Sequence, residues 1–231
     1  MKFRLKRRLA EALINGCGLW RLHDSSVQLF VRTVLDEIDF QHMRNTHPCP
    51  EFTDRLEMYR HINKDTIKGN AIDYLEFGVF RGESMRSWVK LNVDKNSRFY
   101  GFDSFEGLPE TWRQTQPKGH FNVDGNVPQI DDSRVTFVKG WFGETVPEFI
   151  RNFTAQNRLV VHLDADLYSS SMVALIYLSP YLKSGSLLIF DEFYDRDHEF
   201  KAFQDYLRIS RNTYRVVCNT ARFAKTCIEL I

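Results

Sequence analysis

An alternation of short apolar runs with helical segments, beginning at residue 71, constrains the fold more than any other feature of the chain. Five runs are expected to be strands, at 71–77, 98–102, 134–139, 158–163 and 186–190. Apolar residues recur at helical spacing between and after them, at 83–92, 143–153, 170–183 and 197–210. Continuous apolar strands separated by helices indicate a parallel sheet that is buried on both faces.

The end of the chain breaks this alternation. Two strand-like runs, 213–219 and 222–230, follow the last helix and are joined by a tight turn at about Thr220-Ala221. Such a hairpin places one antiparallel strand in an otherwise parallel sheet. We therefore predict an α/β fold, the Rossmann-like seven-stranded sheet of class I methyltransferases with helices on both faces. This domain is expected over residues 70–231, after a helical N-terminal prefix or cap over 1–69.

The N-terminal segment carries five basic residues in its first eight, as a secretory leader would. Glu11 and Asn15 interrupt the apolar stretch that follows, and no convincing cleavage site is present. We predict a basic amphipathic helix, no transmembrane segment and a cytoplasmic protein; contact with a membrane surface or a second copy is the alternative. The formal net charge of +1 gives no reason to expect a nucleic-acid partner.

The stretch AIDYLEFGVFRGES, residues 71–84, has the order strand, glycine turn, helix. This order builds nucleotide-cofactor pockets at the carboxyl end of a parallel sheet. Gly78 and Gly82 would let the backbone pass close to a ligand, and Glu76 would accept from an ammonium group or a ribose. The spacing lacks the three glycines of the dinucleotide fingerprint, so a turn without a ligand stays open as an alternative.

The next two strands also end in candidate cofactor residues. Asp103 would bind both hydroxyls of a ribose, or else cap a following helix. Gly140 would let the backbone approach a planar base, and Trp141 or Phe142 would cover its face or simply belong to the core.

Four carboxylates follow the fourth and fifth strands, Asp164 and Asp166 after one and Asp191 and Glu192 after the other. Neighbouring strands lie about 4.8 Å apart, so these groups would repel one another unless a cation neutralises them. Oxygen ligands favour Mg²⁺ or Ca²⁺; helix caps and solvated turns are the alternative. His162, inside its strand, is interpreted as a core histidine rather than a ligand, and His120 as a residue able to approach a substrate.

Five motifs in order resemble the macrocin O-methyltransferase (TylF-type) family over roughly residues 70–205: LEFGVFRGES, YGFDSFEGLPE, VKGWFGETVP, VHLDADLYSSS and LLIFDEF. The resemblance implies S-adenosylmethionine- and Mg²⁺-dependent methylation of a hydroxyl on a small polar acceptor, a sugar or glycosylated metabolite. It implies Asp166 as general base and Asp164, Asp191 and Glu192 as metal ligands, although the family usually has aspartate at the last position. Family members often self-associate, so a homodimer is considered. The cofactor-binding residues expected on this basis are Glu76, Gly78, Val79, Phe80, Arg81, Gly82, Ser84, Asp103, Ser104, Gly140, Trp141 and Asp164.

Two other functions fit parts of the pattern. A metal-dependent glycosyltransferase would use Asp164-Ala165-Asp166 as an Asp-x-Asp motif for a nucleotide-sugar diphosphate, but Glu76 would put an anion near the diphosphate and no basic cluster compensates. A non-catalytic module that binds S-adenosylmethionine is the third possibility. The sequence does not identify the acceptor or the position methylated.

Overall fold

The computed structural model describes residues 8–12, 37, 39–43, 49–221 and 223–231. The chain divides into two compact units, Met1–Pro48 and Cys49–Ile231. In the first unit the described residues are helical. Two helices were predicted in this part of the sequence, and most of their residues lie outside the described ranges. No helix in the described part of the chain is long and apolar enough to cross a membrane.

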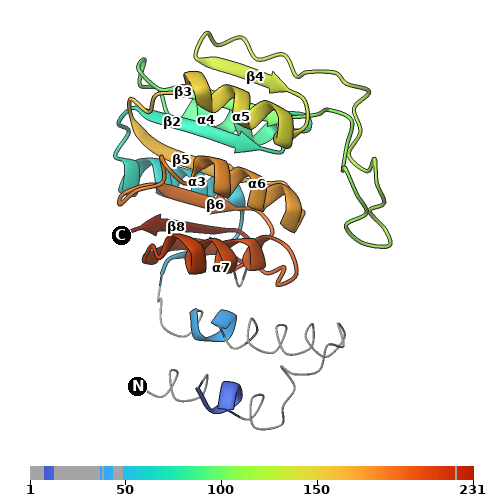
Figure 1. Cartoon of the computed structure of the whole chain (residues 1–231). Coiled ribbons are helices and arrows are strands. Elements are labelled where there is room, and N and C mark those ends of the chain that lie inside the picture. The colour runs from blue at the N-terminus through green and yellow to red at the C-terminus, as the bar shows by residue number, and fades with distance from the viewer. Residues whose placement is uncertain (1–7, 13–36, 38, 44–48, 222) are drawn as a thin grey trace. The chain divides into compact units, whose positions relative to one another are not determined.

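The second unit is built on one mixed sheet of eight strands in the order β1-β7-β8-β6-β5-β2-β3-β4 (Figure 1). The predicted fold class is confirmed: the sheet is mostly parallel, and β8 runs antiparallel to both β6 and β7. The additional strand that the sequence did not predict is β1, which pairs with β7 at the edge of the sheet. It has only two residues, so its sequence shows no periodicity. The strand bounds are β1 (Glu51–Phe52), β2 (Ile72–Phe77), β3 (Arg98–Asp103), β4 (Val135–Lys139), β5 (Arg158–Leu163), β6 (Leu187–Phe190), β7 (Tyr214–Thr220) and β8 (Thr226–Leu230).

Helices cover both faces of this sheet, with α3 and α4 on one side and α5, α6 and α7 on the other (Figure 1). Their bounds are α3 (Arg55–His61), α4 (Glu83–Leu91), α5 (Phe142–Asn152), α6 (Tyr168–Leu178) and α7 (Glu199–Ser210). The α6 helix stops five residues before its predicted end, beside Pro180, which has no backbone N–H to continue the helical hydrogen bonds. The α3 helix continues as a π-helical segment, Ile62–Ile67, which the sequence pattern did not predict.

Residues 49–69, expected to belong to the N-terminal prefix, contribute to the core of the second unit. Met58, Tyr59 and Ile62 are fully buried together with Tyr74 of β2 and Trp88 of α4. The Tyr59 and Tyr74 rings both lie 5.2 Å from the Trp88 ring, centroid to centroid. These contacts attach α3 and α4 to the same face of the central strand.

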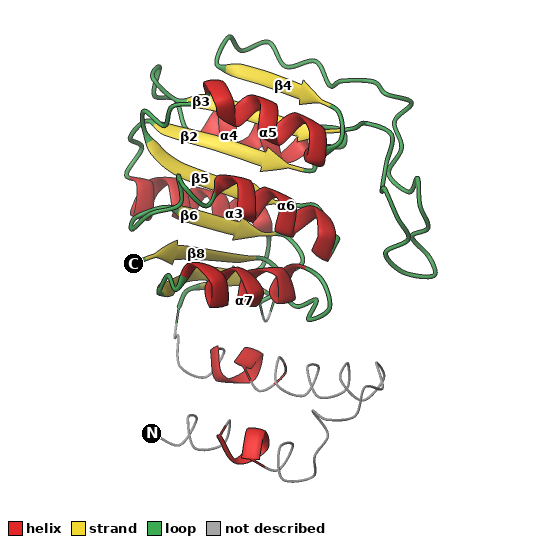
Figure 2. Cartoon of the chain, viewed as in Figure 1, coloured by secondary structure: helices red, strands yellow, loops and turns green. Residues whose placement is uncertain are grey.

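Strand register decides which residues meet at the carboxyl edge of the sheet. Leu163 of β5 pairs with Phe190 of β6, so the next residues, Asp164 and Asp191, emerge side by side. The long loop between β3 and β4, residues 104–134, contains no helix and only one isolated bridge, between Arg113 and Gln116 (Figure 2). Asp103 therefore has no following helix to cap.

Candidate active site

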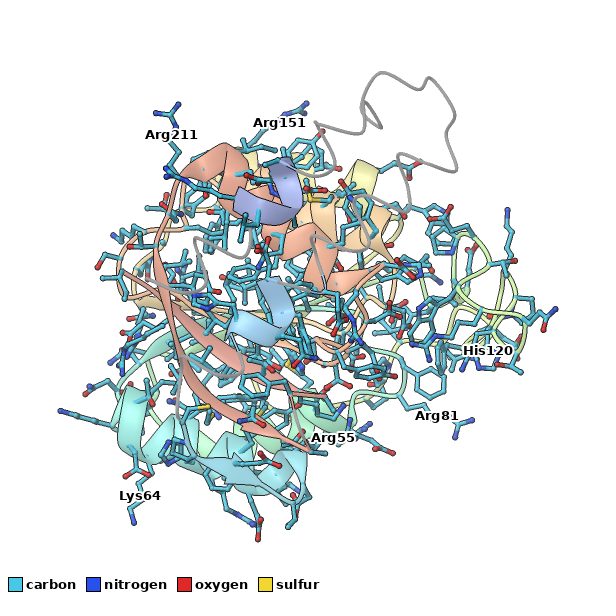
Figure 3. All side chains as sticks on the ribbon, turned by 90° about the horizontal axis from the view of Figure 1, so that it is seen from below. Arg55, Lys64, Arg81, His120, Arg151 and Arg211 are labelled. Atoms are coloured by element: carbon cyan, nitrogen blue, oxygen red, sulfur yellow. The ribbon has the colours of Figure 1, made fainter. Side chains whose placement is uncertain are left out.

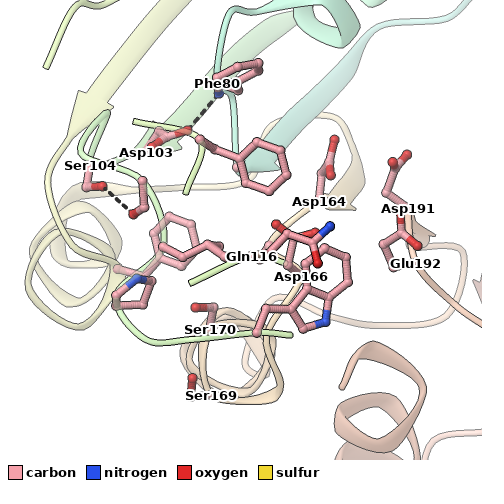
Figure 4. A pocket seen from close by; sticks show the side chains of 18 of the residues that line it. Phe80, Asp103, Ser104, Gln116, Asp164, Asp166, Ser169, Ser170, Asp191 and Glu192 are labelled. Carbon is pink, nitrogen blue, oxygen red and sulfur yellow. Dashed lines mark hydrogen bonds between the residues drawn. The ribbon is translucent and has the colours of Figure 1, made fainter. Parts of the chain in front are cut away.

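A cavity of about 670 Å³ lies at the carboxyl ends of β2, β3, β5 and β6, beneath the 104–134 loop. Nine of the predicted site residues line it: Gly78, Phe80, Asp103, Ser104, Trp141, Asp164, Asp166, Asp191 and Glu192. Figure 4 shows Asp103 on one side of this cavity and the acidic residues on the other. Six other predicted residues are not among its lining residues: Glu76, Val79, Arg81, Gly82, Ser84 and Gly140.

The glycine turn after β2 is shaped by a close approach of two backbones. Gly78 has a φ of +93°, and a Cβ added there would lie 1.8 Å from the carbonyl oxygen of Asp164. No side chain is compatible with that contact. Glycine at this position thus lets the turn pass against the segment that follows β5, which brings the cofactor-side loop and the acidic residues together.

Asp103 holds this turn in place. Its Oδ2 accepts hydrogen bonds from the backbone N–H groups of Phe80 (2.7 Å; Figure 4) and Val79 (2.8 Å). Its Oδ1 accepts from Phe105 N–H (2.7 Å). A carboxylate has about four acceptor sites, so these bonds leave capacity for a ligand hydroxyl. Asp103 is therefore a structural anchor that also faces the cavity.

Glu76 lies behind the turn rather than in the cavity wall, and its side chain is fully buried. Ser84 Oγ donates to one carboxylate oxygen, and Tyr74 OH donates to the other at 3.3 Å. Burial raises the pKa of Glu76 to about 7, although His162 and these two hydrogen bonds oppose the increase. The carboxylate links β2 to the first turn of α4, a role that the sequence alone did not distinguish from ligand binding.

The remaining predicted cofactor residues support the turn from outside the cavity. Arg81 is exposed and projects outward, as does His120 on the long loop (Figure 3). Gly82, with a φ of +75°, starts α4, and Gly140 N–H donates to the Asp103 carbonyl at 2.9 Å. His120 does not line the cavity; its neighbour Phe121 does, and their rings lie 4.3 Å apart.

Asp164 and Asp191 form the centre of the acidic group, and His162 is their third neighbour. One ligand atom from each of the three lies within 4.8 Å of the others. Lys225 Nζ donates to Asp191 Oδ2 from the turn before β8. Burial opposes ionisation of Asp191, but His162 and Lys225 outweigh it and lower its pKa to about 2. Burial and the nearby Asp191 and Asp166 carboxylates raise the pKa of Asp164 well above its usual value.

Asp166 lines the cavity with a φ of +58°. This is the left-handed region, which aspartate adopts more readily than most other non-glycine residues. Burial raises its pKa to about 7, helped by the nearby charges of Glu192 and Asp191 and opposed by Arg113 and Lys225. A carboxylate with this pKa exchanges protons near neutral pH, as a general base must.

A contact that the sequence pattern did not reveal closes the cavity on its loop side. Asp195 Oδ2 accepts from Trp112 Nε1 at 3.2 Å and from Arg113 Nη2 at 2.7 Å. The Arg113 guanidinium also lies 4.0 Å over the Trp112 ring. More than 80 residues separate the two sides of this contact, so no local pattern announces it. Lys225 lies 34 residues from Asp191 in the sequence, and no local pattern reveals that contact either.

Comparisons with known proteins agree with this architecture. A family model described as Macrocin-O-methyltransferase (TylF) matches residues 53–218. The chain is 31% identical over 178 residues to 8-demethyl-8-(2,3-dimethoxy-alpha-L-rhamnosyl)-tetracenomycin-C 4'-O-methyltransferase of Streptomyces olivaceus, covering 66% of this chain and 63% of that enzyme. It is 28% identical to demethyldecarbamoylnovobiocin O-methyltransferase of Streptomyces niveus, covering 60% of each chain. The matches thus span less than two thirds of these relatives.

Solved structures show the same fold. A calicheamicin methyltransferase superposes with a TM-score of 0.61 at 23% identity, covering 90% of this chain and 94% of the other. The O-methyltransferase NovP superposes with a TM-score of 0.60 at 20% identity, covering 86% and 98%. Both likenesses extend over most of the sheet that carries the cavity.

Proposed function

Because the chain belongs to the macrocin O-methyltransferase (TylF) family, we propose that it transfers a methyl group from S-adenosylmethionine to a hydroxyl of a sugar or glycosylated natural product. The observation that carries this proposal is one cavity with Asp103 and the glycine turn on one side and the acidic residues on the other. Relatives whose names specify methylation of a rhamnosyl or novobiocin-type compound support the acceptor class.

The cofactor would occupy the side of the cavity formed by Gly78, Phe80, Asp103, Ser104 and Trp141. It supplies the electrophilic methyl group. Asp103, already oriented by backbone N–H groups, would accept from a ribose hydroxyl, and Trp141 would contact the base. Val79, Arg81, Gly82, Ser84, Glu76 and Gly140 would act by shaping this turn, since none of them lines the cavity.

A divalent cation would be held at the other side by Asp164 and Asp191. These residues fit a cation because Asp191 Oδ1 is buried and has no hydrogen-bond partner, and because burial of Asp164 beside other carboxylates disfavours its ionised form. For this family the expected ion is Mg²⁺, with Glu192 as a further ligand. A bound cation would lower the pKa of an acceptor hydroxyl.

Asp166 would take the proton from that hydroxyl. The cavity walls would orient the acceptor, since Trp112 and Phe121 line the side formed by the long loop. Orientation of two reactants contributes up to about 7–11 kcal/mol in favourable cases, and a positioned general base adds about 10²–10⁴-fold. The residues present therefore supply binding, orientation and a proton acceptor for in-line transfer.

The glycosyltransferase alternative is less compatible with the cavity. The cavity has two cationic lining residues, Arg55 and Arg113. Arg55 is paired with Glu83, and Arg113 is paired with Asp195. Because both guanidinium groups are already paired, only the cation proposed at Asp164 would be left to neutralise a sugar-nucleotide diphosphate.

The test is calorimetric titration of the full chain with S-adenosylhomocysteine, without and with Mg²⁺. We expect binding in both, and a D103N variant should bind at least tenfold more weakly. No binding of S-adenosylhomocysteine, with binding of a uridine or guanosine diphosphate instead, would overturn the proposal. The cytoplasmic location and the homodimer stay predictions, to be checked by fractionation and by size-exclusion chromatography with light scattering.

A further inference from the structure

The imidazole of His162 faces the two metal-binding candidates from inside β5. Asp164 is the first residue after β5, and its carboxylate belongs to the same cluster as the imidazole. His162 is fully buried, and its Nε2 has no hydrogen-bond partner. Asp191 Oδ1, also without a hydrogen-bond partner, lies 3.7 Å away, within reach of an ion pair when the imidazole is protonated but beyond hydrogen-bond distance. Two unpartnered polar atoms at one buried point are costly unless something binds both.

The separation of these atoms indicates what they would bind. A distance of 3.7 Å is too long for a hydrogen bond between Nε2 and Oδ1. Two atoms that each bind one ion at about 2.1 Å lie between about 3 and 4.2 Å apart, depending on the angle. The pair therefore has the spacing of two ligands of a shared cation, with Asp164 as the third group of the same cluster.

Hydrogen bonding on the far side of the ring supports the required tautomer. Tyr74 OH donates its proton to Glu76 Oε2 and lies 2.7 Å from His162 Nδ1. When this hydroxyl donates to Glu76, its oxygen accepts from Nδ1–H. A cation that displaces any proton between Nε2 and Asp191 would then meet the lone pair of Nε2. A ring fixed in this way by a second hydrogen bond is the usual arrangement of a metal-binding histidine.

Glu192 occupies a different position. Its backbone N–H donates to Glu199 Oε2 at 2.9 Å, and its side chain lies beside Tyr194. Figure 4 shows Asp164 and Asp191 turned in the same direction, whereas Glu192 points another way. Lys225 already binds Asp191 Oδ2, which leaves Oδ1 as the oxygen available on the side of His162.

We propose that His162 Nε2, Asp164 and Asp191 are the protein ligands of the divalent cation, with His162 in the place expected for Glu192. A nitrogen ligand favours first-row transition ions over Mg²⁺, so the site would bind Mn²⁺ more tightly than Mg²⁺. Glu192 would then be free to contact the acceptor. The inference rests on the proposed function only in that the cation serves the same cavity.

The test is pulsed electron paramagnetic resonance of the full chain loaded with Mn²⁺, together with calorimetric titration of Mn²⁺ and Mg²⁺. We expect a ¹⁴N coupling to Mn²⁺ and at least tenfold tighter binding of Mn²⁺ than of Mg²⁺. His162→Gln should abolish the coupling and weaken Mn²⁺ binding at least tenfold. Tyr74→Phe, which keeps the imidazole but removes its partner, should retain the coupling with weaker binding.

Glu192→Gln is the matched comparison, and it should change Mn²⁺ affinity by less than about threefold. Bound Mn²⁺ without ¹⁴N coupling in the unmodified protein would overturn the proposal, whether or not the variants fold. So would absence of Mn²⁺ binding, or its loss in Glu192→Gln with retention in His162→Gln. S-adenosylhomocysteine titrated into the metal-free samples tests the methyltransferase proposal separately, since that binding does not depend on which residue holds the cation.

Discussion

Lys225 donates a hydrogen bond to Asp191 from the turn between β7 and β8, so a fixed cation lies beside the acidic group before any ion binds. The Asp191 side chain is 8% exposed and that of Lys225 is 22% exposed. Removing the ammonium would leave a buried carboxylate without its cationic partner, a change that typically costs about 1–3 kcal/mol. The hairpin that completes the fold therefore also stabilises the site.

We predict that Lys225→Met lowers the melting temperature of the metal-free protein by about 5 °C. A saturating divalent cation should restore most of this loss, because it would replace the missing charge at Asp191. Thermal unfolding monitored by circular dichroism measures both effects. Glu83→Gln, which breaks the more exposed pair with Arg55, is the control and should change the melting temperature little. An equal loss with and without the cation would contradict the prediction.

Asp166→Asn should lower the turnover number about 10²–10⁴-fold and leave the affinity for S-adenosylhomocysteine within about twofold. The substitution keeps the shape of the side chain and removes its ability to accept a proton. Steady-state kinetics and calorimetry provide the two readouts. Asp131→Asn, at an exposed position away from the cavity, is the matched control. Turnover that survives within a few-fold would show that Asp166 is not the base.

The stability of the metal-free protein should fall as the pH rises from about 5 to 7. Glu76 and Asp166 both have a pKa of about 7 in the folded protein, above the usual range of carboxylates near 4. Between these values the folded state binds more protons than the unfolded state, so raising the pH favours unfolding. Above about pH 7 this contribution levels off.

Melting temperatures measured in EDTA between pH 5 and 8 test this dependence. Asp166→Asn should flatten part of the decline, and a saturating divalent cation should reduce it further by stabilising the ionised carboxylates. A melting temperature that rises across this interval in EDTA would exclude the buried-carboxylate explanation.

Much of the fold could be predicted from the sequence because the central strands β2, β5 and β6 are buried on both faces. The run Ile72–Phe77 is buried throughout, and a run that is apolar apart from Asp73 and Glu76 indicates a central strand without knowledge of its neighbours. The two-residue strand β1 and the π-helical segment Ile62–Ile67 lack a period that a pattern can reveal. Their structure is set by packing rather than by local preference.

Only those site residues that directly follow the ends of strands could be predicted from the sequence. Asp164 and Asp191 were expected side by side because both follow paired residues of adjacent strands. The pattern did not show that Glu76 faces the core or that His162 faces Asp191. Strand periodicity indicates on which face of the sheet a side chain lies, but not which residues it contacts. The contact between Arg113 and Asp195 depends on the path of a loop that has no periodicity at all.

Asp195→Asn should loosen the long loop and raise the KM for the acceptor several-fold, with little change in S-adenosylhomocysteine affinity. The substitution removes the charge that both Trp112 and Arg113 contact. Hydrogen exchange should become faster in peptides that cover residues 110–118, and this readout does not require the acceptor to be known. Asp197→Asn, at an exposed neighbouring position, is the control. Unchanged exchange in these peptides would show that Asp195 does not hold the loop.

Gly78→Ala should strongly destabilise the protein. The added Cβ would lie 1.8 Å from the carbonyl oxygen of Asp164, a backbone atom that cannot rotate away, and the φ of +93° is unfavourable for alanine. A backbone clash of this kind costs more than about 2 kcal/mol. Gly143→Ala is the matched control, because a Cβ added there would have no atom within 4 Å and α5 favours alanine. Chemical denaturation should therefore show a large loss for the first variant and almost none for the second, and equal stability of the two would contradict the close approach of the glycine turn to Asp164.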